Sequence, residues 1–333
     1  MSTRTGIIVL SSTPGMSRIQ SARRWRGLLT FLLSAVAMIA VPAAPVRADF
    51  LYVSNTGDNS IAKFTPGGGA GSVFANSGLS GPFGIAFDSA GNLYAANYFA
   101  NTIEKFTPGG IGSVFASSGL NHPVGLAFDK AGNLYVANQN NSPSIEKFTP
   151  GGSSSVFATT GLSITPEGIA FDSAGNLYVA NLGSSNIEKF TPGGVGSVFA
   201  STGSNAPNGL AFDRAGNLYA AISGSTIGAI EKFTPGGVGT IFAGSGLSTP
   251  NGLAFDSGGN LYAANAGDNS IEKFTPGGVG SVFASGLSTP RFLAFTDDAG
   301  VPLALANTPE PASLSLLTLT GLALLRRTRR LTT

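Results

Sequence analysis

The residues whose types suit binding or catalysis recur at one position of an internal repeat, directly after a proline. In the six copies this position holds Phe83, Val124, Glu167, Asn208, Asn251 and Arg291. Three consecutive copies therefore supply Glu167, Asn208 and Asn251, whose side-chain oxygens are hard ligands of the kind that Ca²⁺ prefers. A divalent-cation site is one interpretation of this pattern, and polar rim residues in solvent are the other. The sequence requires no cofactor.

Other candidate groups are few. Tyr98 and Phe99 form an aromatic pair in a variable segment, where they could stack on a sugar ring or a partner protein, or pack on a neighbouring copy. His122 is the single His, and it has no adjacent nucleophile or carboxylate, so we expect a structural role. The chain has no Cys, which excludes thiol nucleophiles and disulfides. We therefore assign no catalytic residue and lean against an enzyme.

The basic residues of the chain are concentrated at its ends. Of the 19 Lys and Arg in 333 residues, ten are Arg that lie within residues 1–48 and 326–330. Residues 49–308 contain 9 Lys and Arg against 16 Asp and Glu, a net charge of −7. A body of this sign has no electrostatic basis for binding a phosphate backbone, so nucleic acid is excluded as a partner.

The repeat that must position the candidate residues has a period of 41 to 43 residues. The string FTPGG begins at Phe64, Phe106, Phe148, Phe190, Phe233 and Phe274. The second copy divides into four short strands, 84–88, 93–96, 103–106 and 113–116, joined by turns rich in Asp, Pro and Gly. This period and these strands predict an all-β fold, a six-bladed β-propeller with four-stranded antiparallel blades, over residues 49–307.

The phase of the repeat predicts how the ring closes. The first copy starts at its second strand (51–53), and an extra first strand (292–295) follows the last copy. Pairing these two strands completes the sixth blade. Phe292 and Thr296 replace the Gly and Asp of the other copies, as expected at a seam. Residues 301–307 are either a surplus second strand or a linker.

The two ends of the predicted propeller differ in sequence. The turns DSAGN and TPGG recur almost unchanged at one end, whereas the loops at the other end vary in sequence and length. Variable loops on a rigid scaffold are the usual place for a binding surface. The recurring Glu-Lys pair of the third strand, for example Glu104-Lys105, predicts a ladder of ion pairs between neighbouring blades, with solvated charges as the alternative.

The pattern xPxG, FDxxGNLYVAN and NxIxKF resembles the NHL repeats over about residues 50–307. That resemblance implies a six-bladed propeller. Gluconolactonase-like propellers are similar in using Glu, Asn and Asp from different blades, but the likeness is of residue type only. It implies metal-assisted lactone hydrolysis as a possible activity.

Residues 1–48 have the organisation of a secretory signal peptide. Arg23, Arg24 and Arg26 precede an apolar run over 27–41, and small residues follow at the usual spacing for cleavage before Asp49. We expect an apolar helix here and processing by signal peptidase. Translation could start at Met1 or Met16.

The C-terminal residues 308–333 have three parts. Pro309, Glu310 and Pro311 precede an apolar stretch over 312–325, and Arg326, Arg327, Arg329 and Arg330 follow it. This order resembles the PEP-CTERM sorting signal, which implies cleavage by an exosortase and sorting to the cell surface or extracellular matrix. A basic cluster after an apolar segment stays cytoplasmic, so 312–325 is expected to be a short, transient transmembrane helix.

From these observations we expect an exported, monomeric propeller that binds a protein or exopolysaccharide without catalysis. The candidate ligand-binding residues are Tyr98, Phe99, Glu167, Asn208, Asn251 and Arg291. The alternative is a metal-dependent extracytoplasmic hydrolase or lyase of the gluconolactonase type that uses the channel mouth. A structural matrix protein without a specific ligand is a third class.

Overall fold

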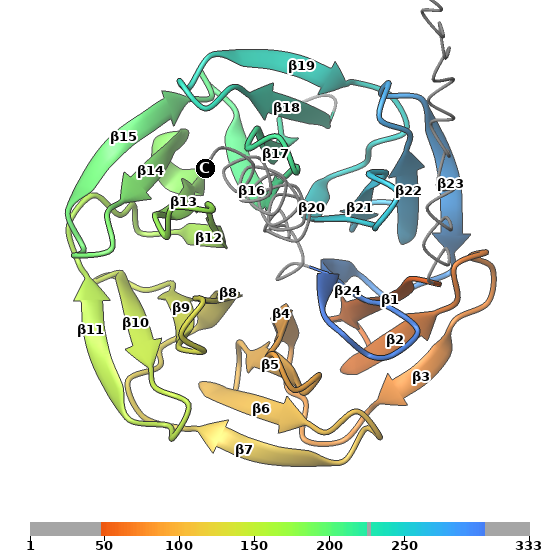
Figure 1. The fold of residues 1–333 in the computed structure, drawn as a ribbon, viewed down its shortest axis with the longest axis horizontal. Coiled ribbons are helices and arrows are strands. Elements are labelled where there is room, and N and C mark those ends of the chain that lie inside the picture. Colours follow the sequence, from red (N-terminus) through yellow and green to blue (C-terminus); the bar gives the residue numbers. More distant parts are fainter. Residues whose placement is uncertain (1–47, 225–227, 304–333) are drawn as a thin grey trace, which may run out of the picture. The chain divides into compact units, whose positions relative to one another are not determined.

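The computed structural model describes residues 48–224 and 228–303, which form six four-stranded antiparallel sheets around a central axis (Figure 1). This confirms the predicted six-bladed β-propeller. Apart from the short 3₁₀-helix η1 (Leu182–Ser184), the described residues contain no helix. In the same residues, no helix has the length and apolar character needed to cross a membrane. The expected terminal helices and the sorting signal lie outside the described residues.

We call the strands of each blade a, b, c and d from the axis outward. Blade 1 contains β24 (Pro290–Thr296), β1 (Phe50–Asn55), β2 (Ser60–Phe64) and β3 (Ser72–Ala75). Blade 2 contains β4 (Pro82–Phe87), β5 (Leu93–Asn97), β6 (Thr102–Phe106) and β7 (Gly112–Ala116). Blade 3 contains β8 (Pro123–Phe128), β9 (Leu134–Asn138), β10 (Ser144–Phe148) and β11 (Ser154–Ala158). Blade 4 contains β12 (Pro166–Phe171), β13 (Leu177–Asn181), β14 (Asn186–Phe190) and β15 (Gly196–Ser201). Blade 5 contains β16 (Ala206–Phe212), β17 (Leu218–Ser223), β18 (Ala229–Phe233) and β19 (Gly239–Ala243). Blade 6 contains β20 (Pro250–Phe255), β21 (Leu261–Asn265), β22 (Ser270–Phe274) and β23 (Gly280–Ser285).

The turn between strands a and b is held by its own Asp. In blade 2 the Oδ1 atom of Asp88 accepts the N–H groups of Ala90 and Asn92, each at 2.9 Å. Gly91 has a φ of +79°, a left-handed conformation that favours glycine. Asp and Gly at these positions therefore fix a tight reversal, and this explains why the repeated DSAGN motif predicts the strand boundaries well.

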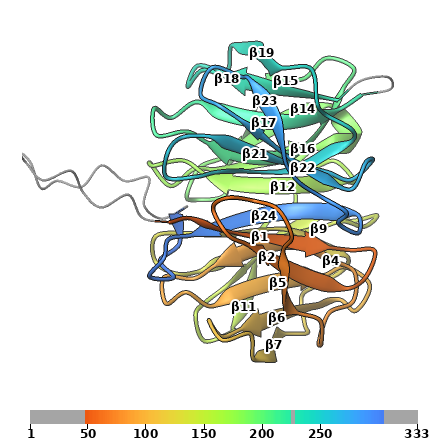
Figure 2. The same cartoon turned by 90° about the vertical axis from the view of Figure 1, so that its right-hand side faces the viewer.

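The ring closes at blade 1 as the sequence predicts. The strand β24 pairs with β1, with Leu51 opposite Phe295 and Val53 opposite Leu293, and Figure 2 places the two strands side by side. Thr296 is one extra residue before the turn, so Asp297 takes the place that the other blades give to Asp88 and its equivalents. Asp297 Oδ1 accepts the N–H groups of Ala299 and Val301. An isolated antiparallel bridge joins Thr296 and Pro302. Residues 304–307 lie outside the described residues, so the choice between a surplus strand b and a linker over 301–307 stays open.

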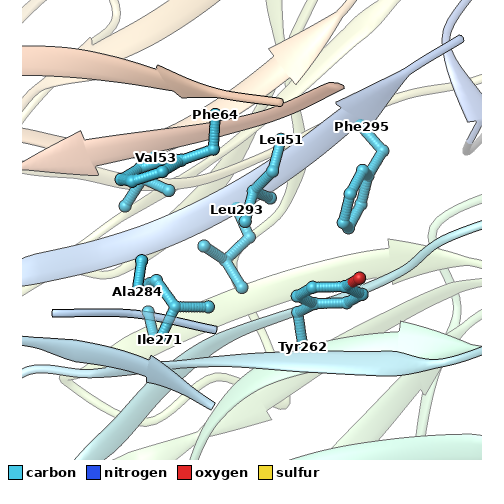
Figure 3. Packing of buried hydrophobic residues seen from close by; sticks show 9 residues of the cluster. Leu51, Val53, Phe64, Tyr262, Ile271, Ala284, Leu293 and Phe295 are labelled. Carbon is cyan, nitrogen blue, oxygen red and sulfur yellow. The ribbon is translucent and has the colours of Figure 1, made fainter. Parts of the chain in front are cut away.

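Aromatic rings hold neighbouring blades together. At the seam, Tyr262 of blade 6 meets Phe283 of its own blade and Phe295 of blade 1 edge to face, with ring centroids 5.0 and 4.9 Å apart. Leu51, Val53 and Leu293 are buried in the same cluster (Figure 3). Each of the other five interfaces repeats this arrangement with its own Tyr and Phe. The core is therefore a closed ring of equivalent layers between blades.

The predicted ladder of ion pairs between blades is wrong. Among the described residues, Lys105 lies 3.6 Å from Asp88 of its own blade and 5.2 Å above the centre of the Tyr94 ring. Three further blades contain the same Lys–Asp pair. Glu104 is on the opposite face of the strand, is only 5% exposed, and lies against Gly78 and Gly112. The Glu and the Lys of this motif therefore lie on opposite faces of the strand and contact different residues.

These buried carboxylates make stability depend on pH. Burial raises the pKa of the strand-c glutamates above the ordinary value of 4.5, and the group comprises Glu104, Glu146, Glu188, Glu231 and Glu272. The folded state then binds protons more tightly than the unfolded state, so stability should increase as pH falls from neutral toward 4.5. Thermal unfolding of residues 49–308 should give a higher Tm at pH 5 than at pH 7.

The variant Glu104→Gln tests whether the buried carboxylates cause this pH dependence of stability. It removes the buried charge, so its Tm at pH 7 should equal or exceed that of the parent chain, and its Tm should rise less on acidification. Asp298→Asn removes a charge from an exposed position and should change stability by less than about 0.5 kcal/mol. A parent chain whose Tm falls between pH 7 and pH 5 would contradict the prediction.

Candidate functional site at the channel mouth

The inner strands approach one another closely just below the variable end of the channel. A methyl group added at Gly168 would lie 2.6 Å from the backbone oxygen of Asn208 and 2.8 Å from the Cα atom of Gly209. Equivalent glycines of the other blades meet the backbone of the next inner strand in the same way, namely Gly84, Gly125, Gly209 and Gly252. We call these five residues the glycine collar. The collar fixes the residues just before it, which are the six candidates that follow proline.

Arg291 connects candidates from three blades. Its guanidinium carbon lies 4.7 Å above the centre of the Phe83 ring in blade 2, and its Nη1 donates a 3.3 Å hydrogen bond to Asn251 Oδ1 in blade 6. Its Nε atom is buried without a hydrogen-bond partner among the described residues. Burial lowers the pKa of Arg291, and the charge of Glu167 acts in the opposite direction. Arg291 therefore presents a partly desolvated cation at the mouth.

Glu167 comes from blade 4, on the side of the ring opposite Arg291. Its Oε1 accepts a 2.6 Å hydrogen bond from Gln139 Nε2. Burial raises the pKa of Glu167 to about 7, and the hydrogen bond from Gln139 and the charge of Arg291 offset only part of this effect. Near neutral pH this carboxyl group can therefore hold a proton, so it can donate as well as accept a hydrogen bond.

The aromatic candidates continue from the Phe83 ring that Arg291 covers. Tyr98 stacks on Phe83 with ring centroids 4.7 Å apart and planes 24° apart, and its other contacts are Phe99 and His122. Phe99 is 66% exposed. His122 has a left-handed φ of +47°, and its backbone N–H is held by Asn101 Oδ1 at 2.6 Å. The ring of His122 packs against Tyr98 with ring centroids 4.7 Å apart, and its structural role stays a prediction.

The two asparagines are buried, and their amide groups hold adjacent loops. Asn208 Nδ2 donates to Ser223 Oγ at 2.8 Å and to the backbone oxygen of Pro250 at 3.1 Å. Asn251 Nδ2 donates to the backbone oxygen of Thr249. Residues 48–224 and 228–303 contain no group of three His, Asp or Glu side chains that could hold a metal ion. The cation of Arg291 beside Asn251 also disfavours a divalent cation there, because like charges repel.

The structure adds site residues that the sequence analysis missed. Gln139 contacts Glu167, and Ser223 contacts Asn208. Gln139 and Ser223 occupy the same repeat position as Tyr98, at the end of strand b. Residue types at this position vary as much as those after proline, so aligning the copies at the end of strand b would have found them.

The fold and this mouth define the class of protein: a six-bladed β-propeller with one variable end that gathers a cation, a carboxyl group, amides and aromatic rings. No protein-family model and no curated protein matches the chain. Solved structures do resemble it. A nidogen/laminin complex matches with a TM-score of 0.65 and 22% identity, over 74% of this chain and 98% of that chain.

Two enzymes are also among the similar structures. A virginiamycin B lyase from Staphylococcus aureus matches with a TM-score of 0.58 and 17% identity, over 74% of this chain and 88% of that one. A gluconolactonase from Xanthomonas campestris matches with a TM-score of 0.58 and 17% identity, over 73% and 88% of the two chains. Identities this low concern the fold alone, so these comparisons leave binding and catalysis as separate possibilities.

Proposed function

We propose that the chain is an exported, non-enzymatic binding module that holds a polysaccharide at its variable channel mouth. The observation that supports this proposal is that Arg291 of blade 1 lies over the Phe83–Tyr98 stack of blade 2 at the channel mouth, where the charge of Glu167 of blade 4 also acts on Arg291. A sugar ring has an apolar face that packs on aromatic side chains and hydroxyl groups that exchange hydrogen bonds with charged and amide groups. The exposed Phe99 extends the aromatic surface beyond the channel.

The terminal segments support a location outside the cell. The leader over 1–48 would be removed by signal peptidase before Asp49. The segment from Pro309 to Arg330 would direct membrane anchoring and then exosortase cleavage, leaving the propeller at the surface or in the matrix. Asp49 fits this scheme, because its Oδ2 accepts the N–H of Ser257 at 2.7 Å and so belongs to the fold.

Binding should depend on the mouth and not on the opposite end. On a glycan array, Arg291→Ala and Tyr98→Ala should each weaken binding of residues 49–308 by about thirtyfold or more, as expected for central anchor residues. Arg214→Ala is the matched control: it removes the same charge at the end of the repeated turns, where Arg214 Nη2 donates to the backbone oxygen of Ser257. Equal losses in all three variants would contradict the proposal, and binding only to a protein partner would replace the polysaccharide.

A metal-dependent hydrolase or lyase is the second candidate. The observation that favours it is the pKa of Glu167, because a carboxyl group that titrates near 7 in a channel mouth is suited to proton transfer. A metal that binds only the folded state stabilises it by about 2.7 kcal/mol at a hundredfold excess over Kd. The binding module predicts no such shift with Ca²⁺, Mg²⁺ or Mn²⁺. A shift that Glu167→Gln abolishes would favour the enzyme.

A further inference from the structure

The channel contains a second chamber on the other side of the glycine collar, between the inner strands that Figure 1 shows around the axis. Its volume is about 220 Å³. At least three successive apolar residues of every inner strand line it, from 85–87 of β4 to 292–295 of β24. Each of these runs contains a half-buried alanine, and the six are Ala86, Ala127, Ala170, Ala211, Ala254 and Ala294. Their small side chains leave an apolar space along the axis.

One end of this chamber is polar. Arg214, Asp256 and Ser257 line it at the repeated a–b turns. Arg214 is exposed, so the chamber reaches solvent at this end. The chamber therefore combines apolar walls with a polar opening, which suits a ligand with one apolar end and one polar end.

The carboxylate at this opening already has partners. Asp256 Oδ1 accepts the N–H of Asn260 at 2.7 Å, and Oδ2 accepts Asn260 Nδ2 at 2.7 Å and the Tyr262 hydroxyl at 3.2 Å. Lys273 Nζ lies 3.7 Å from the same Oδ2 atom. The charge of Asp256 is therefore balanced within its own blade.

Arg214 is the charge at this opening that a ligand can use. Its Nη2 donates a 2.9 Å hydrogen bond to the backbone oxygen of Ser257, and it forms no ion pair with a carboxylate of the described residues. A guanidinium has five N–H donors in a planar fork that matches the two oxygens of a carboxylate. Arg214 therefore provides a place for one carboxylate beside the apolar chamber.

We propose that this chamber binds an aliphatic carboxylate of medium chain length, with the chain between the inner strands and the carboxylate on Arg214. Transfer of the chain from water to apolar walls is favourable. An engineered protein cavity of about 150 Å³ lined by Leu, Ile and Phe binds benzene, so this chamber is large enough for a longer apolar group. Asp256 would repel a second negative charge, so a carboxylate fits better than a phosphate. The inference is independent of the polysaccharide proposal, because it concerns the opposite end of the channel.

Calorimetric titration of residues 49–308 with three probes of equal chain length tests the head group. Octanoate should bind with one-to-one stoichiometry, and octylammonium should bind at least about tenfold more weakly because Arg214 repels it. In Arg214→Ala the affinity for octanoate should fall about fivefold to tenfold, toward that of octan-1-ol, whose own affinity should not change. No binding of octanoate, or equal affinities for octanoate and octylammonium, would overturn the proposal.

Lys130→Ala is the matched control for Arg214→Ala. Lys130 has the same repeat position in blade 3, and its Nζ donates to the backbone oxygen of Ser173 at 2.7 Å, but it does not line the chamber. Octanoate should therefore bind Lys130→Ala and the parent chain equally. Equal losses in the two variants would mean that the net charge of this end, and not a site at Arg214, attracts the anion, and would overturn the proposal.

A filled chamber tests where the chain lies. Ala170→Phe places a ring inside the chamber and should abolish binding of octanoate, whereas Ala174→Phe adds the same ring at an exposed turn residue of the same end and should not. Thermal unfolding of both variants checks that they fold. In the parent chain, NMR with ¹³C-methyl alanine should give contacts between octanoate and Ala170, which requires no variant in the site. Contacts with Ala174 but not with Ala170 would place octanoate on the surface and overturn the proposal.

Discussion

Deleting residues 290–303 from the 49–308 propeller should abolish its cooperative thermal unfolding. The deletion removes β24, which pairs along β1 and buries Leu293 and Phe295 at the seam. Losing a buried Phe costs about 3–5 kcal/mol and a buried Leu about 2–5 kcal/mol, and the ladder of β1 loses its partner in addition. Since domains are stable by only about 5–15 kcal/mol, these losses are sufficient to unfold the ring or open it.

The deletion should also change the solution behaviour of the fragment. The strand β1 is buried between β2 and β24, and an exposed strand edge promotes pairing with other chains. Size-exclusion chromatography should therefore detect aggregates, whereas removing only 304–308 should leave a monomer with an unchanged Tm. A truncated chain that stays monomeric and melts at the parent temperature would show that the seam contributes little.

The blades were predictable because their signals are local. Asp88 and Gly91 act within a five-residue turn, and the same turn recurs with each copy, so strand boundaries follow from residue type. The pairing of β24 with β1 followed from the phase of the repeat alone. The one shift, from Thr296 to Asp297, arose because the last strand carries one extra residue before its turn.

The predicted Glu–Lys ion pairs were wrong for a physical reason. The alternation of side chains between the two faces of a strand does not determine which neighbouring residue a long side chain contacts. Lys105 lies opposite Tyr94 in the register of β5 and β6. From there its ammonium group covers the Tyr94 ring and reaches Asp88, whose carboxylate also accepts the Tyr94 hydroxyl. That triad depends on the pairing of three elements, so no single motif contains it.

The positions of the candidate residues at the channel mouth could be predicted from the sequence, but their contacts could not. Repeat alignment placed Arg291 and Glu167 at equivalent positions of different blades. The contacts of Arg291 with Phe83 and Asn251, and of Glu167 with Gln139, join different blades, so they depend on how closely the inner strands approach at the glycine collar. The role of the collar was not apparent from sequence, since a glycine in a strand does not reveal what approaches it.

Replacing one collar glycine should therefore have a large effect on stability. In Gly168→Ala the new methyl group would lie 2.6 Å from the backbone oxygen of Asn208 and 3.1 Å from the amide nitrogen of Leu210. Both neighbours are backbone atoms, so no side chain can move aside, and the inner strands of blades 4 and 5 must separate. Overpacking of this kind costs about 1–3 kcal/mol and more where backbone must shift. We expect about 3 kcal/mol or more, a fall in Tm of roughly 6–12 °C for a domain of this size.

Gly109→Ala is the matched control, because its nearest neighbour would be the Thr107 hydroxyl at 3.9 Å and it should change stability by less than about 0.5 kcal/mol. The comparison also tests the link between scaffold and site. Glu167 directly precedes Gly168, so separation of the inner strands should hydrate its carboxyl group and lower its pKa from about 7 toward the ordinary value. Titration of Glu167 by NMR would detect that change. If Gly168→Ala and Gly109→Ala had equal Tm values and left the titration unaltered, the close approach of the inner strands would not be what positions the mouth. A large loss of stability together with a lowered pKa of Glu167 would mean that the glycine collar determines the protonation state of Glu167.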